Sequence, residues 1–217
     1  MSGGNIRHRA STKRAAKGRL RQPYRQGDLD GLCGVYSAVN AVRALCPEVD
    51  HDTAGCFFET MLLALPKVDT DATTTVSWGV GHRAEGASPT RRQLEHLLKK
   101  ATGHVGDELD IKLTVARLPD RLRHTRNLDA LWGWLARRVS PSCRRRVSDT
   151  TCVAVLGLGG RHSHWTVAVQ VTPSQIRLFD SSRMGVLHRK RCTLGKAVNR
   201  STILPVHVFL IARRNVV

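Results

Sequence analysis

The chain has 217 residues, of which 41% are hydrophobic and 5% aromatic, and it carries 35 Lys and Arg against 17 Asp and Glu, a formal net charge of +18. The apolar content predicts a packed core, and no apolar run approaches the roughly 20 residues of a membrane-spanning helix. The sequence shows no apolar signal segment and no Cys-x-x-C pair. These absences disfavour a secreted disulfide scaffold and predict reduced cysteines and a cytoplasmic protein.

The start of the chain is strongly basic, with eight Lys and Arg and no acidic residue in the first 25 positions. Large apolar side chains are almost absent from residues 1–22, so we predict a basic, disordered tail there and a single domain over residues 23–217. Organellar transit peptides have a similar acid-free, Arg-rich composition. The overall charge attracts acidic partners, so we expect an acidic protein or peptide substrate, with nucleic acid as the alternative partner.

A Gly-rich, acidic turn over residues 26–32 leads into a predicted helix over residues 33–45, in which valines recur at helical spacing. Cys33 is the first residue of this helix. Unpaired N–H groups and the positive end of the helix dipole favour a thiolate over a thiol at that position. Cys33 is therefore a candidate nucleophile, and a small buried structural cysteine is the alternative.

The middle of the chain gives weaker functional signals. Residues 46–56 contain two cysteines, one histidine and three carboxylates, but their spacing matches no common zinc pattern, so we predict neither a metal nor a cofactor. The polar loop over residues 68–86 carries Trp78, a candidate substrate contact because long loops often form binding edges. Further elements are predicted as helices over residues 57–65, 88–103 and after Asn127, and as strands over residues 111–116, 152–158 and 203–212.

A β-hairpin is predicted near the end of the chain. Apolar residues alternate over residues 164–171, a turn follows, and a partner strand runs to residue 179. His164 begins the first strand and Asp180 follows the second, so the two residues should lie side by side. Asp180 is then expected to accept the Nδ1–H bond of His164 and to leave Nε2 for a thiol. His162, two residues earlier, is the rival base.

These positions together resemble the papain-like cysteine peptidase superfamily, most closely the bacteriocin-processing peptidases that cleave double-glycine leaders. The residues that carry the resemblance are, in chain order, Gln26, Cys33, Gly34, His164, Trp165 and Asp180. The resemblance implies that Cys33 is the nucleophile, His164 the general base and Asp180 the residue that orients the base. It also implies that Gln26 forms an oxyanion hole with the backbone N–H of Cys33. We assign Gly34 and Trp165 to substrate binding.

Two other families share parts of this pattern. Residues 30–33 resemble the front motif of ovarian-tumour-type deubiquitinases. Residues 164–165 and 179–181 resemble the back motif of the small-ubiquitin-like-modifier peptidases, although in that family the nucleophile follows the His and Asp. All three families use the same thiol chemistry, so the assignment of Cys33, His164 and Asp180 is the same for each.

Helices come first along the chain and mostly antiparallel strands follow, which predicts an α+β fold. The resemblance implies a papain-like layout, in which an N-terminal helical lobe with the nucleophile helix packs on an antiparallel β-sheet lobe. We therefore predict a thiol hydrolase that cleaves a peptide or isopeptide bond through Cys33, His164 and Asp180. The alternatives are a deamidase or transamidase with the same triad, and a basic nucleic-acid-binding protein whose Cys and His are structural.

Overall fold

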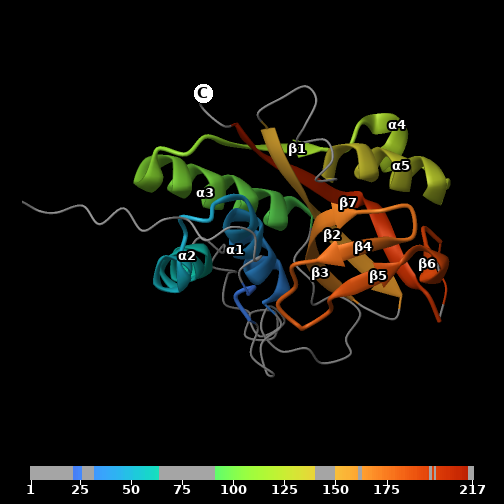
Figure 1. Ribbon diagram of the computed structural model, residues 1–217, viewed down its shortest axis with the longest axis horizontal. Helices are drawn as coiled ribbons and strands as arrows, with labels where there is room; N and C mark the ends of the chain where they lie inside the picture. Colours follow the sequence, from blue (N-terminus) through green and yellow to red (C-terminus); the bar gives the residue numbers. More distant parts are fainter. Residues whose placement is uncertain are drawn as a thin grey trace, which may run out of the picture.

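The computed structural model describes residues 22–25, 32–63, 91–139, 150–160, 163–195, 197 and 199–214. These residues form a mixed α+β fold in which helices cover both faces of a mainly antiparallel sheet (Figure 1). The α+β prediction is therefore confirmed. None of the described helices is long and apolar enough to cross a lipid bilayer. The tail predicted over residues 1–22 lies outside the described residues except for its last position.

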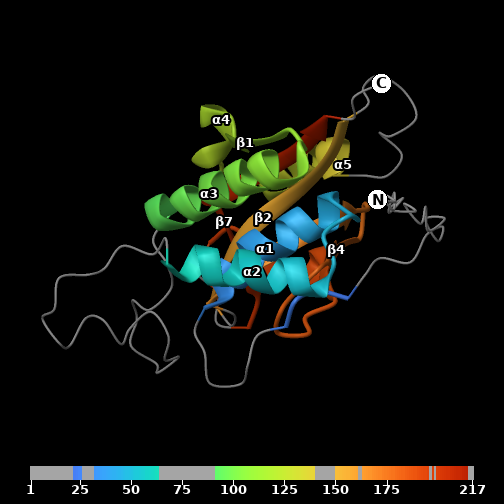
Figure 2. The ribbon, with the colours of Figure 1, turned by 90° about the vertical axis from the view of Figure 1, so that its left-hand side faces the viewer.

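Helices form two groups, one on each face of the sheet. The first group is α1 (Cys33–Leu45), α2 (His51–Leu63) and α3 (Arg91–Leu109), and the second is α4 (Asp120–Arg123) and α5 (Leu128–Val139). Figure 2 shows α1, α2 and α3 side by side in front of β2. Most of the buried apolar residues of α1 to α3 join one apolar cluster, and those of α4 and α5 join another.

The sheet is built mainly from the second half of the chain. Its strands are β1 (Leu113–Arg117), β2 (Thr150–Gly160), β3 (His164–Val171), β4 (Gln175–Leu178), β5 (Val186–His188), β6 (Cys192–Thr193) and β7 (Ser201–Arg214), and a short 3-10 helix, η3 (Arg189–Arg191), lies between β5 and β6. The order is β1-β7-β2-β3-β4-β5 with antiparallel neighbours, while β6 pairs in parallel with β7. The predicted hairpin corresponds to β3 and β4, which pair antiparallel and confirm it.

Alternation along β3 divides the interior into the two clusters. Val167 faces the cluster that contains Val39 of α1, whereas Ala168 faces the cluster that contains Trp132 of α5. Each of these four side chains is at most 1% exposed. Burial of a large apolar side chain stabilises the fold by roughly 1.5–3 kcal/mol, so Val39 and Val167 help to hold α1 against one face of β3, and Trp132 helps to hold α5 against the other.

Helix ends follow local sequence only in part. Asn127 caps α5 as predicted, because its Oδ1 accepts a hydrogen bond of 3.0 Å from the N–H of Ala130. The predicted end of α3 at Gly103 is wrong, since the helix continues to Leu109. Gly103 lies on the exposed side, and the apolar face continues through the fully buried Val105. α3 ends before Asp110, whose φ of 52° is the left-handed conformation common after a helix.

Gly157 allows β2 and β3 to pack closely beneath α1. It lies opposite Trp165 in the sheet register. A Cβ atom at this position would lie 2.5 Å from the Cβ of His207 and 2.9 Å from the Trp165 ring. Only glycine avoids both contacts, so the large Trp165 side chain and the small Gly157 form one packing unit.

Candidate active site

Cys33 is the first residue of α1, and the side chain of the preceding residue, Leu32, makes no capping hydrogen bond. The first N–H groups of a helix have no partner within the helix, so the Cys33 side chain lies at its positive end. Cys33 is 6% exposed and borders the apolar cluster around α1. Gly34 is also buried and follows directly in the first turn. The predicted helix-borne position of Cys33 is thereby confirmed.

The hairpin brings the other two candidate residues together. His164 is the first residue of β3, and Asp180 follows the end of β4. A backbone hydrogen bond of 2.8 Å from the N–H of Phe179 to the carbonyl of Val167 continues the pairing beyond β4. His164 and Asp180 therefore meet at one end of the sheet, and their side chains are joined by a hydrogen bond of 2.7 Å.

One detail of the predicted pair is wrong, because the imidazole is turned the other way round. Nε2 of His164, and not Nδ1, lies 2.7 Å from Oδ2 of Asp180. Nε2 is the ring nitrogen farther from the backbone, so it reaches farther across to the Asp180 carboxylate than Nδ1 would. The arrangement leaves Nδ1, the nitrogen closer to the backbone, as the ring atom available to a thiol.

Cys33 lies close enough to His164 for a side-chain hydrogen bond. Burial disfavours the charged imidazolium, but the hydrogen bonds to Asp180 and Cys33, together with the charges of both groups, outweigh burial and raise the pKa of His164 from 6.5 to about 9. At neutral pH the His164 ring is therefore positively charged, with the Asp180 carboxylate and the Cys33 thiol as its partners. This is the arrangement that an imidazolium–thiolate pair requires.

Asp180 is held as a carboxylate by a set of donors around it. It is 3% exposed, and Oδ1 accepts hydrogen bonds from the Ser182 N–H at 2.9 Å, the Ser182 hydroxyl at 2.8 Å and the Met184 N–H at 3.1 Å. Burial opposes ionisation, but the hydrogen bond and charge of His164 and the hydrogen bond of Ser182 keep the pKa of Asp180 below its usual value. Oδ1 thus anchors the carboxylate while Oδ2 faces the imidazole.

Ser182 is a site residue that the sequence pattern did not single out. Its hydroxyl oxygen lies 3.3 Å from Nε2 of His164 while the hydroxyl donates to Asp180, so it touches both members of the pair. A local signal is present, because an Asp followed two residues later by Ser commonly forms a turn closed by the Asp side chain. Arg183 completes this turn with a left-handed φ of 69°.

Asn40 on α1 is a second residue that the sequence pattern did not single out. Its side chain accepts a hydrogen bond of 2.7 Å from the N–H of Tyr24 and donates one of 3.0 Å to the carbonyl of Tyr24. Asn40 is 1% exposed, so both bonds are shielded from water. They fix the chain beside α1 shortly before the residues that lead to Cys33.

Of the remaining predicted site residues, the structure describes Trp165 and buries it. Trp165 is 2% exposed and packs against His207 and Phe209 in the core, so the expected substrate contact by Trp165 has no accessible surface. The Trp165 ring belongs to the apolar cluster around α1 and lies against Gly157 and His207, and these contacts bury it. Gln26, Trp78 and His162 lie outside the described residues, and their roles remain predictions.

Within the described part of the chain no cluster of three or more His, Cys, Asp or Glu could hold a metal ion. No pair of the described cysteines forms a disulfide. Comparison of the chain with protein families, with curated proteins and with solved structures finds no match in any of the three.

Proposed function

We propose that this protein is a thiol hydrolase that cleaves a peptide or isopeptide bond, with Cys33 as nucleophile, His164 as acid and base, and Asp180 as the residue that orients His164. The observation that carries the proposal is the imidazole of His164, which is hydrogen-bonded to both the Asp180 carboxylate and the Cys33 thiol. The three side chains come from a helix start, a strand start and a strand end, which are separate in the sequence.

The reaction follows from these roles. The Cys33 thiolate attacks the carbonyl carbon of the scissile bond, and the carbonyl oxygen takes up negative charge. The proton on Nδ1 of His164 passes to the leaving amine, which departs as the C–N bond breaks, and a thioester with Cys33 remains. A water molecule then gives a proton to Nδ1 and attacks the thioester, which releases the carboxylic acid and restores the thiolate.

Each neighbouring group supports one of these steps. The carboxylate of Asp180 stabilises the imidazolium of His164 and occupies Nε2, so that Nδ1 is the nitrogen left to exchange a proton. The N–H groups of the first turn of α1 are suited to stabilise the developing oxyanion, because donors at a helix start are unpaired and the dipole favours negative charge there. We propose that the papain-like layout and the contribution of Gln26 complete this site.

A deamidase or transamidase would use the same thioester, so the products decide between these reactions. The wild-type protein and Cys33→Ala are incubated with a peptide library from a whole-cell digest, and the products are read by mass spectrometry. We expect new peptide termini with the wild type only. Amide side chains converted to carboxylates would instead identify a deamidase, and new amide cross-links a transamidase. Identical products with Cys33→Ala would contradict the proposal in all three forms.

A further inference from the structure

Charge is distributed very unevenly in this fold. Residues 150–214 contain ten Lys and Arg but a single acidic residue, Asp180, which is buried and bonded to His164. Residues 32–63, which form α1 and α2, contain four acidic residues and one Arg. The cations of residues 150–214 therefore have almost no carboxylates in the same part of the chain.

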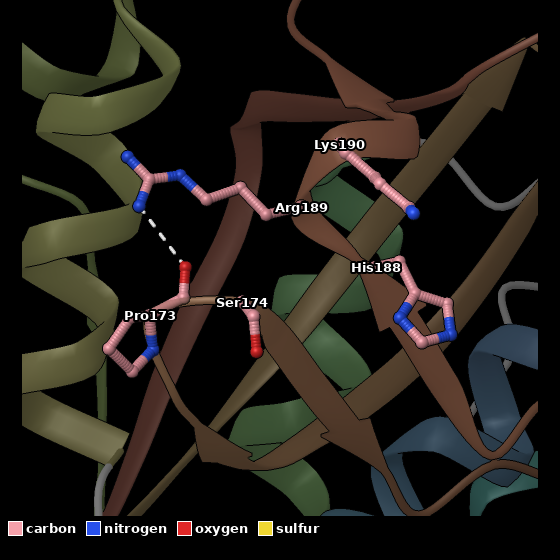
Figure 3. Close-up of a pocket in the computed structure, with 5 residues that line it drawn as sticks. All are labelled: Pro173, Ser174, His188, Arg189 and Lys190. Carbon is pink, nitrogen blue, oxygen red and sulfur yellow. Dashed lines mark hydrogen bonds between the residues drawn. The ribbon is translucent and has the colours of Figure 1, made fainter.

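Two hollows are lined by residues of η3 and of α5, and an ion pair connects these two elements. The first lies between the β3–β4 turn and η3 and is lined by Pro173, Ser174, His188, Arg189 and Lys190 (Figure 3). The second lies along α4 and α5, with Arg121, Asn127, Trp134 and Arg137 among its lining residues.

An ion pair joins the walls of these hollows. Arg189 lines the first hollow and Asp129 lines the second, and their side chains are 2.6 Å apart. In Figure 3 the Arg189 side chain extends towards α5, and its guanidinium also donates a hydrogen bond of 3.1 Å to the carbonyl of Pro173. Its guanidinium lies over the ring of Trp132 as well. Arg189 is thus a structural link between η3 and α5, and its ion pair joins a wall of one hollow to a wall of the other.

The acidic residues on this surface are already neutralised. Asp129 pairs with Arg189, and Asp120 of α4 pairs with Arg123. By contrast, Arg121 and Lys190, which line the hollows, and Arg126 and Arg191, which adjoin lining residues in the sequence, are exposed and make no ion pair with any carboxylate of the described residues. We call these four residues the basic face. Unpaired like charges repel one another, so a polyanion bound there would relieve this repulsion.

We propose that the basic face binds the phosphate backbone of a nucleic acid, as a function separate from the proposed thiol chemistry. Three of its four cations are Arg, whose guanidinium binds phosphate oxygens through two parallel hydrogen bonds. An acidic substrate segment would need to continue into the site at Cys33. α4 and α5, however, pack on the sheet face opposite α1, so a chain bound along them is not directed to Cys33. The phosphate backbone is therefore the better-matched ligand.

The test uses the full-length protein and a fluorescein-labelled DNA duplex of about 20 base pairs, with an RNA duplex and poly-glutamate of equal length as further probes. Binding is followed by anisotropy over a series of salt concentrations. The face variant is Arg121→Gln with Lys190→Gln. The matched control, Arg92→Gln with Lys100→Gln, removes the same charge from exposed positions on α3.

Each phosphate contact contributes about 0.9 to the slope of log K against log salt, so the face variant should lower this slope by about two. Its affinity should fall on the order of tenfold per lost contact near 0.1 M salt, whereas the control binds like the wild type. A preference for the DNA or RNA duplex identifies which nucleic acid is bound. Cys33→Ala should bind normally, which separates this proposal from the proposed hydrolase.

Three results would overturn the proposal. The wild type could fail to bind either duplex. The face variant could bind with the same affinity and slope as the control, which would assign binding to the basic N-terminal residues. Poly-glutamate could bind as tightly as the duplexes, which would identify an acidic protein as the partner. Circular dichroism of both variants ensures that lost binding is not lost folding.

Discussion

Asp180→Asn tests the His164–Asp180 pair without disturbing the loop that holds it. Asparagine keeps an oxygen in place of Oδ1, which can still accept the hydrogen bonds from Ser182 and Met184. The amide NH₂ then replaces Oδ2 and donates to Nε2 of His164. The proton of a neutral imidazole is thereby forced onto Nδ1, and the charged form loses its carboxylate partner.

The size of the effect follows from the pKa of His164, which lies at about 9 instead of 6.5. At 1.36 kcal/mol per unit, the partners of His164 stabilise the imidazolium by roughly 3 kcal/mol after the cost of burial. Asp180 contributes more of this than Cys33 does. If Asp180→Asn removes roughly 2 kcal/mol of this stabilisation of the imidazolium, kcat/KM at neutral pH should fall about 30-fold.

The assay measures kcat/KM against pH on a peptide from the cleavage screen. In the wild type, activity should fall as the pH rises through about 9, where His164 loses its proton. In Asp180→Asn this fall should move towards 6.5, and His164→Ala should lose more activity than Asp180→Asn. Asp129→Asn, the same change at an exposed ion pair, should leave the profile unchanged. An unaltered pH profile in Asp180→Asn would refute the role of Asp180.

Three further outcomes are expected. Ser182→Ala removes a hydrogen-bond donor to Asp180 and should lower kcat/KM about fivefold. The fall in activity at alkaline pH should also move to lower pH. An unshifted pH profile would show that Ser182 has only a packing role. Gly157→Ala should destabilise the fold by roughly 2 kcal/mol or more in urea unfolding, because its Cβ meets Trp165 and His207, whereas Gly103→Ala, with open space around it, should stabilise α3 by about 0.5–1 kcal/mol. The pKa of His164 is raised in the folded state, so the stabilisation that protonated His164 gives the fold is complete below pH 6.5 and is lost as the pH rises to about 9. The free energy of unfolding of the wild type should therefore fall by roughly 3 kcal/mol over this range. His164→Ala should not show this fall.

The hairpin is predictable because local patterns determine it. Alternating apolar residues define β3, and the turn length sets the register, so the amino-acid pattern alone predicts that His164 and Asp180 lie side by side. The helix start at Cys33 is likewise visible from the valine spacing that follows it. These signals involve residues that are close together in the sequence, so they can be recognised without the structure.

Other features depend on contacts between distant segments. Nε2 of His164 is the nitrogen bonded to Asp180, and no sequence spacing specifies which of the two ring nitrogens is nearer to the carboxylate. Trp165 adjoins His164 in the sequence, which suggests a substrate contact, but its burial follows from Gly157 and His207 on other strands. The sequence pattern identifies which residues come together more reliably than it identifies the atoms that touch.

The central claim is that His164 activates Cys33, and the most direct measurement is the rate at which iodoacetamide labels individual cysteines, mapped by mass spectrometry. Exposure alone predicts that Cys56, which is exposed, reacts before Cys33, which is 6% exposed. We predict the opposite order in the wild type, and the loss of rapid Cys33 labelling in His164→Ala, because the thiolate needs its imidazolium partner. Faster labelling of Cys56 in the wild type, or unchanged labelling of Cys33 in His164→Ala, would contradict the account.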